Sequence, residues 1–275
     1  LPKAESSPGW QREANGTIRY YNSENGALLR IERTFSDQFG IRYEFYEGGP
    51  GSERLVRAAD DYGSFEFYRG DRGDERVVQR THEDDGSTEY LEGRRGEERV
   101  THVELRNGVV MYYDGKKDEE HVVRKEFLDG VVWYYAGKKG KEHLVRIKWP
   151  KGEVSHFKGD RNNERLVRVE FPNGVVRYYD GEQEQEALVR VEWPDDYIKY
   201  YEGERDNERL VRVKLPSGKV SHYEGERNNE RLVRVELPNG NVEHYTGERD
   251  KEELVRKELA NGRTLFFTGE PDKQG

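Results

Sequence analysis

The sequence contains no cysteine and only one methionine among its 275 residues. The absence of cysteine excludes a disulfide framework, a thiolate nucleophile and zinc sites built from cysteine. Apolar residues are also scarce: they make up 32% of the chain, whereas they make up about half of a typical soluble domain. No apolar run approaches the roughly 20 residues that a membrane-spanning helix requires. These absences argue against a thick two-layer core and predict that the chain has no transmembrane segment.

Aromatic and charged side chains, by contrast, are frequent. The chain has 18 Tyr, 10 Phe and 4 Trp, which is more aromatic residues than a disordered chain carries. Charged residues make up 37%, with both signs interspersed and a net charge of −9. This acidic balance argues against a nucleic-acid-binding surface and against binding to anionic lipids. A thin, extended, aromatic-rich structure is compatible with both the few apolar residues and the many rings.

A 22-residue period is the main signal in the sequence. Glycine recurs at this spacing at Gly93, Gly115, Gly137, Gly159, Gly181, Gly203, Gly225, Gly247 and Gly269. A second glycine column is interrupted once, by Asp196, and a Leu-Val-Arg triplet recurs from residues 144–146 onward. About ten such units fill residues 48–270. We interpret residues 1–47 as a degenerate repeat or cap, and residues 271–275 as a polar tail.

Each unit has the pattern of a β-hairpin. Residues 167–171 alternate apolar and charged side chains, which is typical of a strand. Asn173-Gly174 is a two-residue turn signal, and residues 175–180 form the return strand. No segment shows a competing helical period. The sequence therefore predicts an all-β fold: an elongated antiparallel β-meander of ten to eleven tandem 22-residue hairpin repeats, twisted or coiled.

A two-residue turn at Asn173-Gly174 would also fix the register of the hairpin. Arg168 would then face Tyr179, Val169 would face Tyr178 and Glu170 would face Arg177. One face of the sheet would carry the valines and the first aromatic residue of each pair, and the other face the arginines and the second aromatic residue. The same register makes Glu192–Lys199 a favourable cross-strand pair and Glu236–Glu243 an unfavourable one.

The repeat also resembles a known family. Tyr-x-Gly followed by a charged segment recurs at Tyr201–Gly203, Tyr223–Gly225 and Tyr245–Gly247, with a turn glycine, Gly218 or Gly240, before the second and the third. This pattern resembles MORN repeats over residues 40–270, although Leu-Val-Arg-Val-Glu replaces the usual Gly-x-Gly and arginine follows Tyr-x-Gly-Glu where an aromatic residue is common. The resemblance implies hairpins stacked into an elongated sheet, and a role as a scaffold or interaction module; some MORN arrays are attached to catalytic domains or linked to membranes.

Two columns of side chains are the candidate binding residues, because tyrosine and arginine are typical of protein interfaces. The second aromatic residues are Tyr113, Tyr135, Phe157, Tyr179, Tyr201, Tyr223 and Tyr245, and the arginines are Arg146, Arg168, Arg190, Arg212 and Arg234. We expect them to lie side by side as one strip that binds a protein partner. The alternative is that each arginine stacks on a neighbouring ring and stabilises the fold. Both roles are compatible.

We expect no metal site, no cofactor and no catalysis. His156, His222 and His244 share one repeat position, where they replace the first aromatic residue, and histidines in adjacent repeats would be roughly 10 Å apart. Carboxylates are spread through every unit instead of forming one asymmetric pair. Two Arg-Gly-Asp triplets, residues 69–71 and 72–74, suggest cell adhesion, but the repeat itself already explains Gly70.

The sequence thus predicts a non-catalytic scaffold that docks protein partners along a face with aromatic and arginine side chains. Two alternatives remain open: a structural subunit of a large assembly, including an organellar one, and a carbohydrate- or polymer-binding module. We expect a soluble protein, and its compartment is left open: an organelle lumen or the cytoplasm after removal of an N-terminal leader are both compatible with Leu1 at the first position. The oligomeric state is left open.

Overall fold

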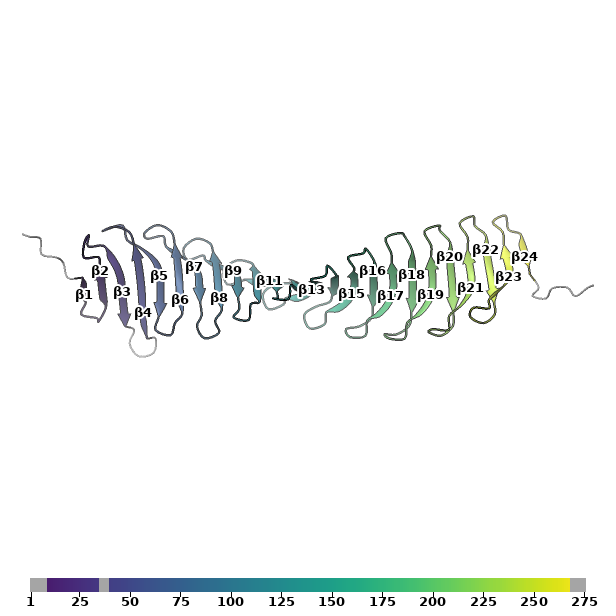
Figure 1. Cartoon of the computed structure of the whole chain (residues 1–275), viewed down its shortest axis with the longest axis horizontal. Coiled ribbons are helices and arrows are strands. Elements are labelled where there is room, and N and C mark those ends of the chain that lie inside the picture. Colours follow the sequence, from purple (N-terminus) through teal and green to yellow (C-terminus); the bar gives the residue numbers. More distant parts are fainter. Residues whose placement is uncertain (1–8, 35–39, 268–275) are drawn as a thin grey trace, which may run out of the picture. The chain divides into compact units, whose positions relative to one another are not determined.

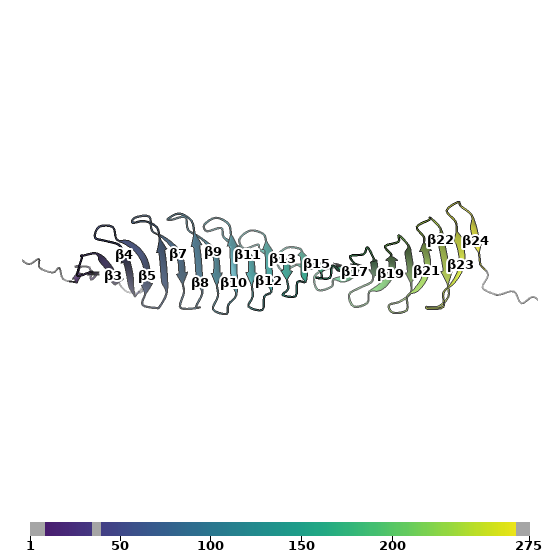
Figure 2. The same cartoon turned by 45° about the horizontal axis from the view of Figure 1, so that its top comes forward.

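The computed structural model describes residues 9–34 and 40–267, and the only regular secondary structure in these ranges is β-strand. This confirms the predicted all-β meander of tandem hairpins. The chain divides into two compact units, Leu1–Glu142 and His143–Gly275, and in each unit the strands follow one another in chain order (Figures 1 and 2). The described residues include no helix that could cross a membrane. The predicted polar tail, residues 271–275, lies outside them.

The first unit contains twelve described strands, each paired antiparallel with the next. They are β1 (Trp10–Arg12), β2 (Ile18–Tyr21), β3 (Leu28–Thr34), β4 (Ile41–Glu47), β5 (Arg54–Asp60), β6 (Phe65–Arg69), β7 (Arg76–Thr81), β8 (Thr88–Glu92), β9 (Arg99–Glu104), β10 (Val110–Asp114), β11 (His121–Glu126) and β12 (Val132–Ala136). The hairpin pattern therefore already operates before residue 48.

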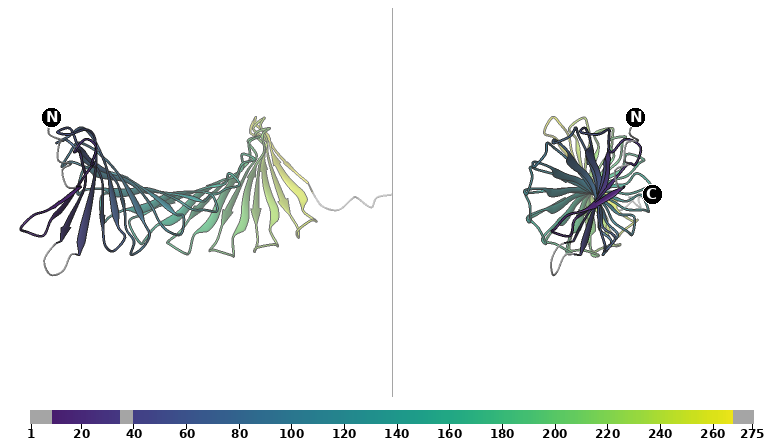
Figure 3. Two further views of the ribbon diagram at one scale, coloured as in Figure 1. Left: turned by 60° about the vertical axis from the view of Figure 1, so that its left-hand side comes forward. Right: turned by 90° about the vertical axis from the view of Figure 1, so that its left-hand side faces the viewer.

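The second unit also contains twelve described strands in an antiparallel meander. They are β13 (His143–Lys148), β14 (Val154–Lys158), β15 (Arg165–Glu170), β16 (Val176–Asp180), β17 (Ala187–Glu192), β18 (Ile198–Glu202), β19 (Arg209–Lys214), β20 (Val220–Glu224), β21 (Arg231–Glu236), β22 (Val242–Thr246), β23 (Glu253–Glu258) and β24 (Thr264–Phe266). Within this unit, successive strands rotate about the sheet axis, so that β18–β24 spread like a fan (Figure 3).

The hairpin turn is one residue longer than predicted. The Phe171 N–H donates to the Val175 carbonyl at 2.8 Å, and the Gly174 N–H donates to the Phe171 carbonyl at 2.9 Å. Only Gly174 has a positive φ, of 82°, and Asn173 does not. The loop is therefore Pro172-Asn173-Gly174, a turn followed by one left-handed residue. Proline fixes its own φ near −65°, which suits the first corner of this three-residue loop.

This extra residue overturns the predicted register. Arg168 pairs with Tyr178, Val169 with Arg177 and Glu170 with Val176, each shifted by one position from the expectation. A shift of one residue moves side chains to the opposite face of a sheet.

The two predicted cross-strand charge pairs are wrong for the same reason. Val191, and not Glu192, lies opposite Lys199. Val235 lies opposite Glu243, which removes the expected repulsion between two glutamates. Glu243 instead binds Lys257 at 2.8 Å.

A β-bulge recurs where each return strand meets the next repeat. Tyr178 pairs with Arg190, but Tyr179 pairs with Leu188, so Val189 is an extra residue. The Leu-Val-Arg triplet of the sequence is therefore the bulge, with its leucine and its arginine on opposite faces of the sheet. The same shift occurs at nine further junctions among the described residues, between Tyr20 and Tyr21 among others.

The connections between repeats are tied together by glutamate side chains. In one of them, Gly203 has a φ of 123° and a turn closes between the Asn207 N–H and the Glu204 carbonyl at 2.9 Å. Glu208 then accepts a hydrogen bond at 3.1 Å from the Leu188 N–H of the preceding repeat. The equivalent carboxylates form a glutamate ladder: Glu53, Glu75, Glu120, Glu164, Glu186, Glu208, Glu230 and Glu252.

The core of the second unit is a single column of small apolar residues. Val169, Val191, Val213 and Val235 are at most 6% exposed, and Ile147 precedes them at 7%. In the first unit, Ile31 and Ala58 hold the equivalent column. Larger side chains on the same face flank these residues, as Leu188 and Tyr179 do beside Val191, so the column is buried although the sheet has one layer.

Candidate binding surfaces on the two faces of the sheet

The corrected register separates the two predicted columns onto opposite faces. Arg168, Tyr178 and Arg190 are joined by direct pairings and share one face, here called the arginine face. The opposite side, here called the valine face, carries the buried valines and the second aromatic residues, because Tyr179 follows Tyr178 on its strand and pairs with Leu188. The single strip predicted from the sequence is therefore wrong.

The predicted residues are distributed accordingly. On the arginine face of the second unit lie Arg146, Arg168, Arg190, Arg212 and Arg234. On the valine face lie Tyr113 and Tyr135 in the first unit, and Phe157, Tyr179, Tyr201, Tyr223 and Tyr245 in the second.

The arginine face is a ladder in which each cation stacks on the first aromatic residue of the preceding strand. The guanidinium of Arg190 lies 3.9 Å from the ring centre of Tyr178, and that of Arg212 lies 3.7 Å from Tyr200. In the first unit, Arg124 stacks on Tyr112 in the same way at 3.8 Å. The stacking anticipated as the alternative role of the arginines thus occurs, but on the first aromatic residue and not on the second.

Hydrogen bonds to glutamate complete this ladder. The Tyr178 hydroxyl donates to Glu192 at 2.8 Å, and Arg190 lies 3.2 Å from the same carboxylate. Histidine takes the place of the first aromatic residue in some repeats and contacts the same glutamate position: His156 lies 2.9 Å from Glu170. His222 and Glu236 repeat this arrangement at 3.1 Å. The charged groups of the arginine face therefore lie in ion pairs with one another, although the buried Nε atoms of Arg124, Arg168 and Arg190 have no hydrogen-bond partner among the described residues.

A double-mutant cycle tests this assignment. The pair Arg190→Ala and Tyr178→Leu should show a coupling of about 0.5–1 kcal/mol, because the cation lies over that ring. The pair Arg168→Ala and Tyr179→Leu, which a two-residue turn would place opposite each other, should show none. Urea unfolding of the four single and two double variants measures both couplings. A larger coupling for the second pair would contradict the register.

The valine face of the second unit has apolar and aromatic side chains that remain accessible. A groove of about 510 Å³ is lined by Phe171, Asn173, Val175, Arg177, Leu188, Val191, Trp193, Lys199 and Tyr201. Arg177 lies 4.9 Å from the Phe171 ring centre, and Trp193 lies 4.9 Å from the ring of Tyr197. Partial burial raises the pKa of Tyr201, and nearby Tyr197 adds to this effect. The groove thus combines rings with two cations.

The tyrosines of this face differ in what their hydroxyls bind. Burial and the Glu243 carboxylate, which accepts a hydrogen bond at 2.9 Å, raise the pKa of Tyr245 to about 12. Among the described residues, neither Tyr179 nor Tyr201 has a hydrogen-bond partner for its hydroxyl. Two half-buried phenols therefore remain able to bind a further group.

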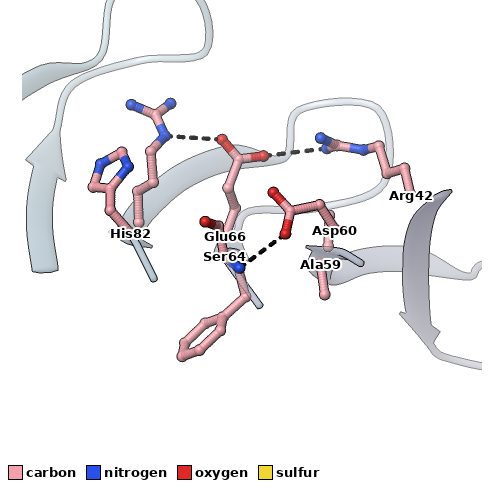
Figure 4. Close-up of a pocket in the computed structure, with 9 residues that line it drawn as sticks. Arg42, Ala59, Asp60, Ser64, Glu66 and His82 are labelled. Atoms are coloured by element: carbon pink, nitrogen blue, oxygen red, sulfur yellow. Dashed lines mark hydrogen bonds and ion pairs between the residues drawn. The ribbon is translucent and has the colours of Figure 1, made fainter. Parts of the chain in front are cut away.

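The valine face of the first unit carries a charge network that the sequence reasoning missed. Glu66 accepts hydrogen bonds from Arg42 at 3.1 Å and Arg80 at 3.0 Å (Figure 4). It also accepts one from the Tyr68 hydroxyl at 2.6 Å. Burial opposes ionisation of Glu66, but these donors lower its pKa overall. Burial and Glu66 together raise the pKa of Tyr68 to about 12.

A pocket of about 230 Å³ opens beside this network and is also lined by Asp60 and His82. It lies over Ala58, where the second unit has valine. The charged groups satisfy one another, so they hold the strands together. The sequence did contain a signal for this network, because Glu44, Glu66 and Glu89 alternate with Arg42 and Arg80. That these residues share one face can be recognised only when the position of the bulge is known.

In the described part of the chain, no three potential ligands among histidine, aspartate and glutamate gather to hold a metal ion. His156, His222 and His244 lie in separate repeats, each beside its own glutamate. In the Arg-Gly-Asp segments, the Arg72 side chain binds the Gly51 carbonyl of the preceding connection. Gly70 has a φ of 122°, as the repeat requires.

No protein-family model and no curated protein matches the chain. Among solved structures, it is similar to a chain in the crystal structure of TcdB2–TccC3, with 11% identity and a TM-score of 0.21 over 89% of this chain and 17% of that chain. It is also similar to a chain in the structure of the Photorhabdus luminescens Tc holotoxin pore, with 12% identity and a TM-score of 0.20 over 92% of this chain and 14% of that chain. The chain thus spans a small part of each, and TM-scores this low carry no inference about function.

Proposed function

We propose that the chain is a non-catalytic scaffold that docks a protein partner on the valine face of its second unit. The groove beside Tyr201 carries this proposal, because accessible rings with unpartnered hydroxyls and flanking cations are the chemistry of protein interfaces. The partner expected to fit presents apolar side chains flanked by acidic ones, complementary to Arg177 and Lys199. The resemblance of the repeats to MORN arrays points to the same role.

We assign docking to the valine face and not to the arginine face because the polar groups of the two faces differ in whether they already bind other residues of the protein. On the arginine face, guanidinium groups, rings and carboxylates bind one another, as in the cluster of Arg190, Tyr178 and Glu192. A partner would have to break those contacts before making its own. On the valine face, docking covers apolar surface and adds hydrogen bonds to Tyr179 and Tyr201 without that cost.

The absence of catalysis is part of the proposal. Among the described carboxylates, Glu66 is the clearest example of a group unsuited to proton transfer, because Tyr68 and two arginines hold its pKa low. A carboxylate stabilised in this way is a poor proton donor or acceptor near neutral pH.

The test is a triple variant, Tyr179→Ser, Tyr201→Ser and Tyr223→Ser. We expect this variant to lose partner capture from native lysate. Its circular dichroism spectrum and strand content should be unchanged, since the three rings flank the buried valines and are not part of that column. The matched control is Lys148→Ser with Lys214→Ser, two exposed positions at the ends of strands β13 and β19, which should capture normally. Full capture by the triple variant would reject the valine face as the contact surface.

A photo-crosslinking amino acid gives a second, sharper readout. Placed at position 201 it lies on the valine face, and placed at position 200 it lies on the arginine face, where Arg212 covers Tyr200. We expect a discrete partner adduct from position 201 only. An adduct only from position 200 would assign docking to the arginine face instead.

A further inference from the structure

The arginine column of the arginine face is interrupted in the first unit. Two consecutive repeats hold Gln79 and His102 at the positions where other repeats hold arginine. His102 lies flat on Tyr90, with ring centres 4.1 Å apart and planes 9° apart. Because neither side chain extends as far as arginine does, a hollow of about 580 Å³ opens beside them.

Two arginines at the edge of this hollow face each other across strands β6 and β7. Arg69 pairs directly with Arg76. Other repeats place an acid opposite this arginine, and ion pairs form: Glu202 with Arg209 at 3.1 Å and Glu47 with Arg54 at 3.8 Å are two of them. Like charges directly opposite each other destabilise a sheet, so Arg69 and Arg76 repel each other within this pair.

Among the described residues, the guanidinium groups of Arg69 and Arg76 make no ion pair and no hydrogen bond. The other like-charged junction, Lys158 with Arg165, differs because Arg165 binds Asp180 at 2.9 Å.

The hollow itself offers further donors to a ligand. Both arginines line it, together with the Gln79 amide and the stacked His102 ring. The Thr101 hydroxyl, also in the lining, already donates to the Tyr90 carbonyl at 3.1 Å. Glu92 is the one carboxylate in the lining, so the two guanidinium groups outnumber it.

We propose that this hollow is a binding site for a phosphate-type oxyanion held between Arg69 and Arg76. A tetrahedral dianion has enough oxygens to accept hydrogen bonds from two converging guanidinium groups at once, and its charge offsets their repulsion. A single carboxylate matches the fork of only one arginine. The site is separate from the docking groove of the second unit, and nothing in it depends on the proposed scaffold role.

The experiment is an NMR titration of the full chain with inorganic phosphate at constant ionic strength, following the arginine Nε signals and the backbone amides of residues 69–102. Sodium chloride and sodium acetate are the parallel arms. We expect saturable shifts at Arg69 and Arg76 with phosphate only. Shifts of equal size in chloride would show screening alone, and saturable shifts in acetate of equal affinity would show a general anion site; either overturns the proposal.

Arg69→Glu is the decisive variant, because it gives this repeat the Glu–Arg pair that its neighbours have. It should bind phosphate at least about tenfold more weakly while unfolding at the same or a higher temperature than the parent, so that loss of binding cannot be blamed on misfolding. Unchanged affinity would overturn the site.

Glu202→Arg is the matched control in the second unit. It creates the same arginine pair with Arg209, but beside a complete arginine column in which Arg212 covers Tyr200. We expect no phosphate binding there. A new site of equal affinity would show that the hollow is not required and would contradict the proposed geometry.

Discussion

Replacing Gly203 with alanine is expected to destabilise its repeat by roughly 1–3 kcal/mol from backbone strain alone. Gly203 has a φ of 123°, a conformation that L side chains rarely adopt. A Cβ atom at this position would lie 2.6 Å from the Asn207 carbonyl oxygen. That oxygen belongs to the backbone of the connection, so relief requires the whole turn to move, and with it the contact between Glu208 and Leu188.

Hydrogen exchange is the measurement that resolves this effect, because each repeat contacts mainly its neighbours and the loss should be local. We expect faster exchange of the amides in β17–β19 than in β13 and β14 of the same unit. Gly49→Ala is the control, since Gly49 lacks a positive φ and the nearest atom to its added Cβ, Ser52 Oγ, is 3.7 Å away. Equal protection in the Gly203 and Gly49 variants would contradict the steric argument.

The fold was predictable because its information is periodic. Gly203 and its equivalents every 22 residues mark a connection that only glycine can form, and alternation within each half of the unit marks the strands. Such signals repeat in every unit, so a single departure does not obscure them. At Asp196, for example, an aspartate takes the left-handed position of the turn glycine, with a φ of 63°.

The faces of the sheet were not predictable from the same signals, because they depend on single-residue offsets. Asn173-Gly174 is a strong signal for a two-residue turn, but the loop includes residue 172 and so has three residues, which changes which side chains meet. The same three-residue loop forms without proline at residues 106–108. The bulge at Val189 makes a second offset that alternation alone does not reveal. The loop places Arg168 opposite Tyr178 instead of Tyr179, and the bulge places Arg190 opposite Tyr178 and Leu188 opposite Tyr179. The proposed strip therefore separated into two surfaces with different chemistry.

The local departures in the first unit were harder still. Gln79 and His102 look unremarkable in the sequence, and their meaning depends on knowing that arginine fills this position elsewhere on the face. The Arg69–Arg76 pair likewise becomes visible only when β6 and β7 are aligned. Departures from a repeat are therefore best sought after the register is known.

Acid is expected to loosen both units through the glutamate ladder. Partial burial disfavours the charged form of Glu208, but the N–H groups of Leu188, Glu208 and Asp206 donate to its carboxylate and lower its pKa overall. Glu230 is held in the same way by the N–H groups of Glu230, Leu210 and Asn228. The unfolded chain, with ordinary carboxyl groups, therefore binds more protons than the folded one.

The sign of the pH dependence follows from this difference. The stabilisation is fully present above the ordinary carboxyl pKa of 4.5 and is lost as the pH falls through the lowered value of the folded state. The pKa is lowered in the same direction at five members of the ladder, Glu53, Glu75, Glu208, Glu230 and Glu252. Their combined protonation should therefore produce a loss of stability below pH 4.5.

Glu208→Gln isolates one contact of the ladder. Glutamine keeps an oxygen that accepts the Leu188 N–H but has no charge to lose. The protection factor of that amide, which is its intrinsic exchange rate at each pH divided by its observed rate, should therefore be smaller at pH 7 and should vary less between about pH 6 and about pH 3, roughly the range over which a carboxyl group titrates. Glu204→Gln is the control, because the Glu204 side chain has no partner among the described residues. If both variants kept the parental pH dependence at Leu188, the ladder would not be the source of the acid sensitivity, and the stability would instead depend on the hairpin contacts within each repeat.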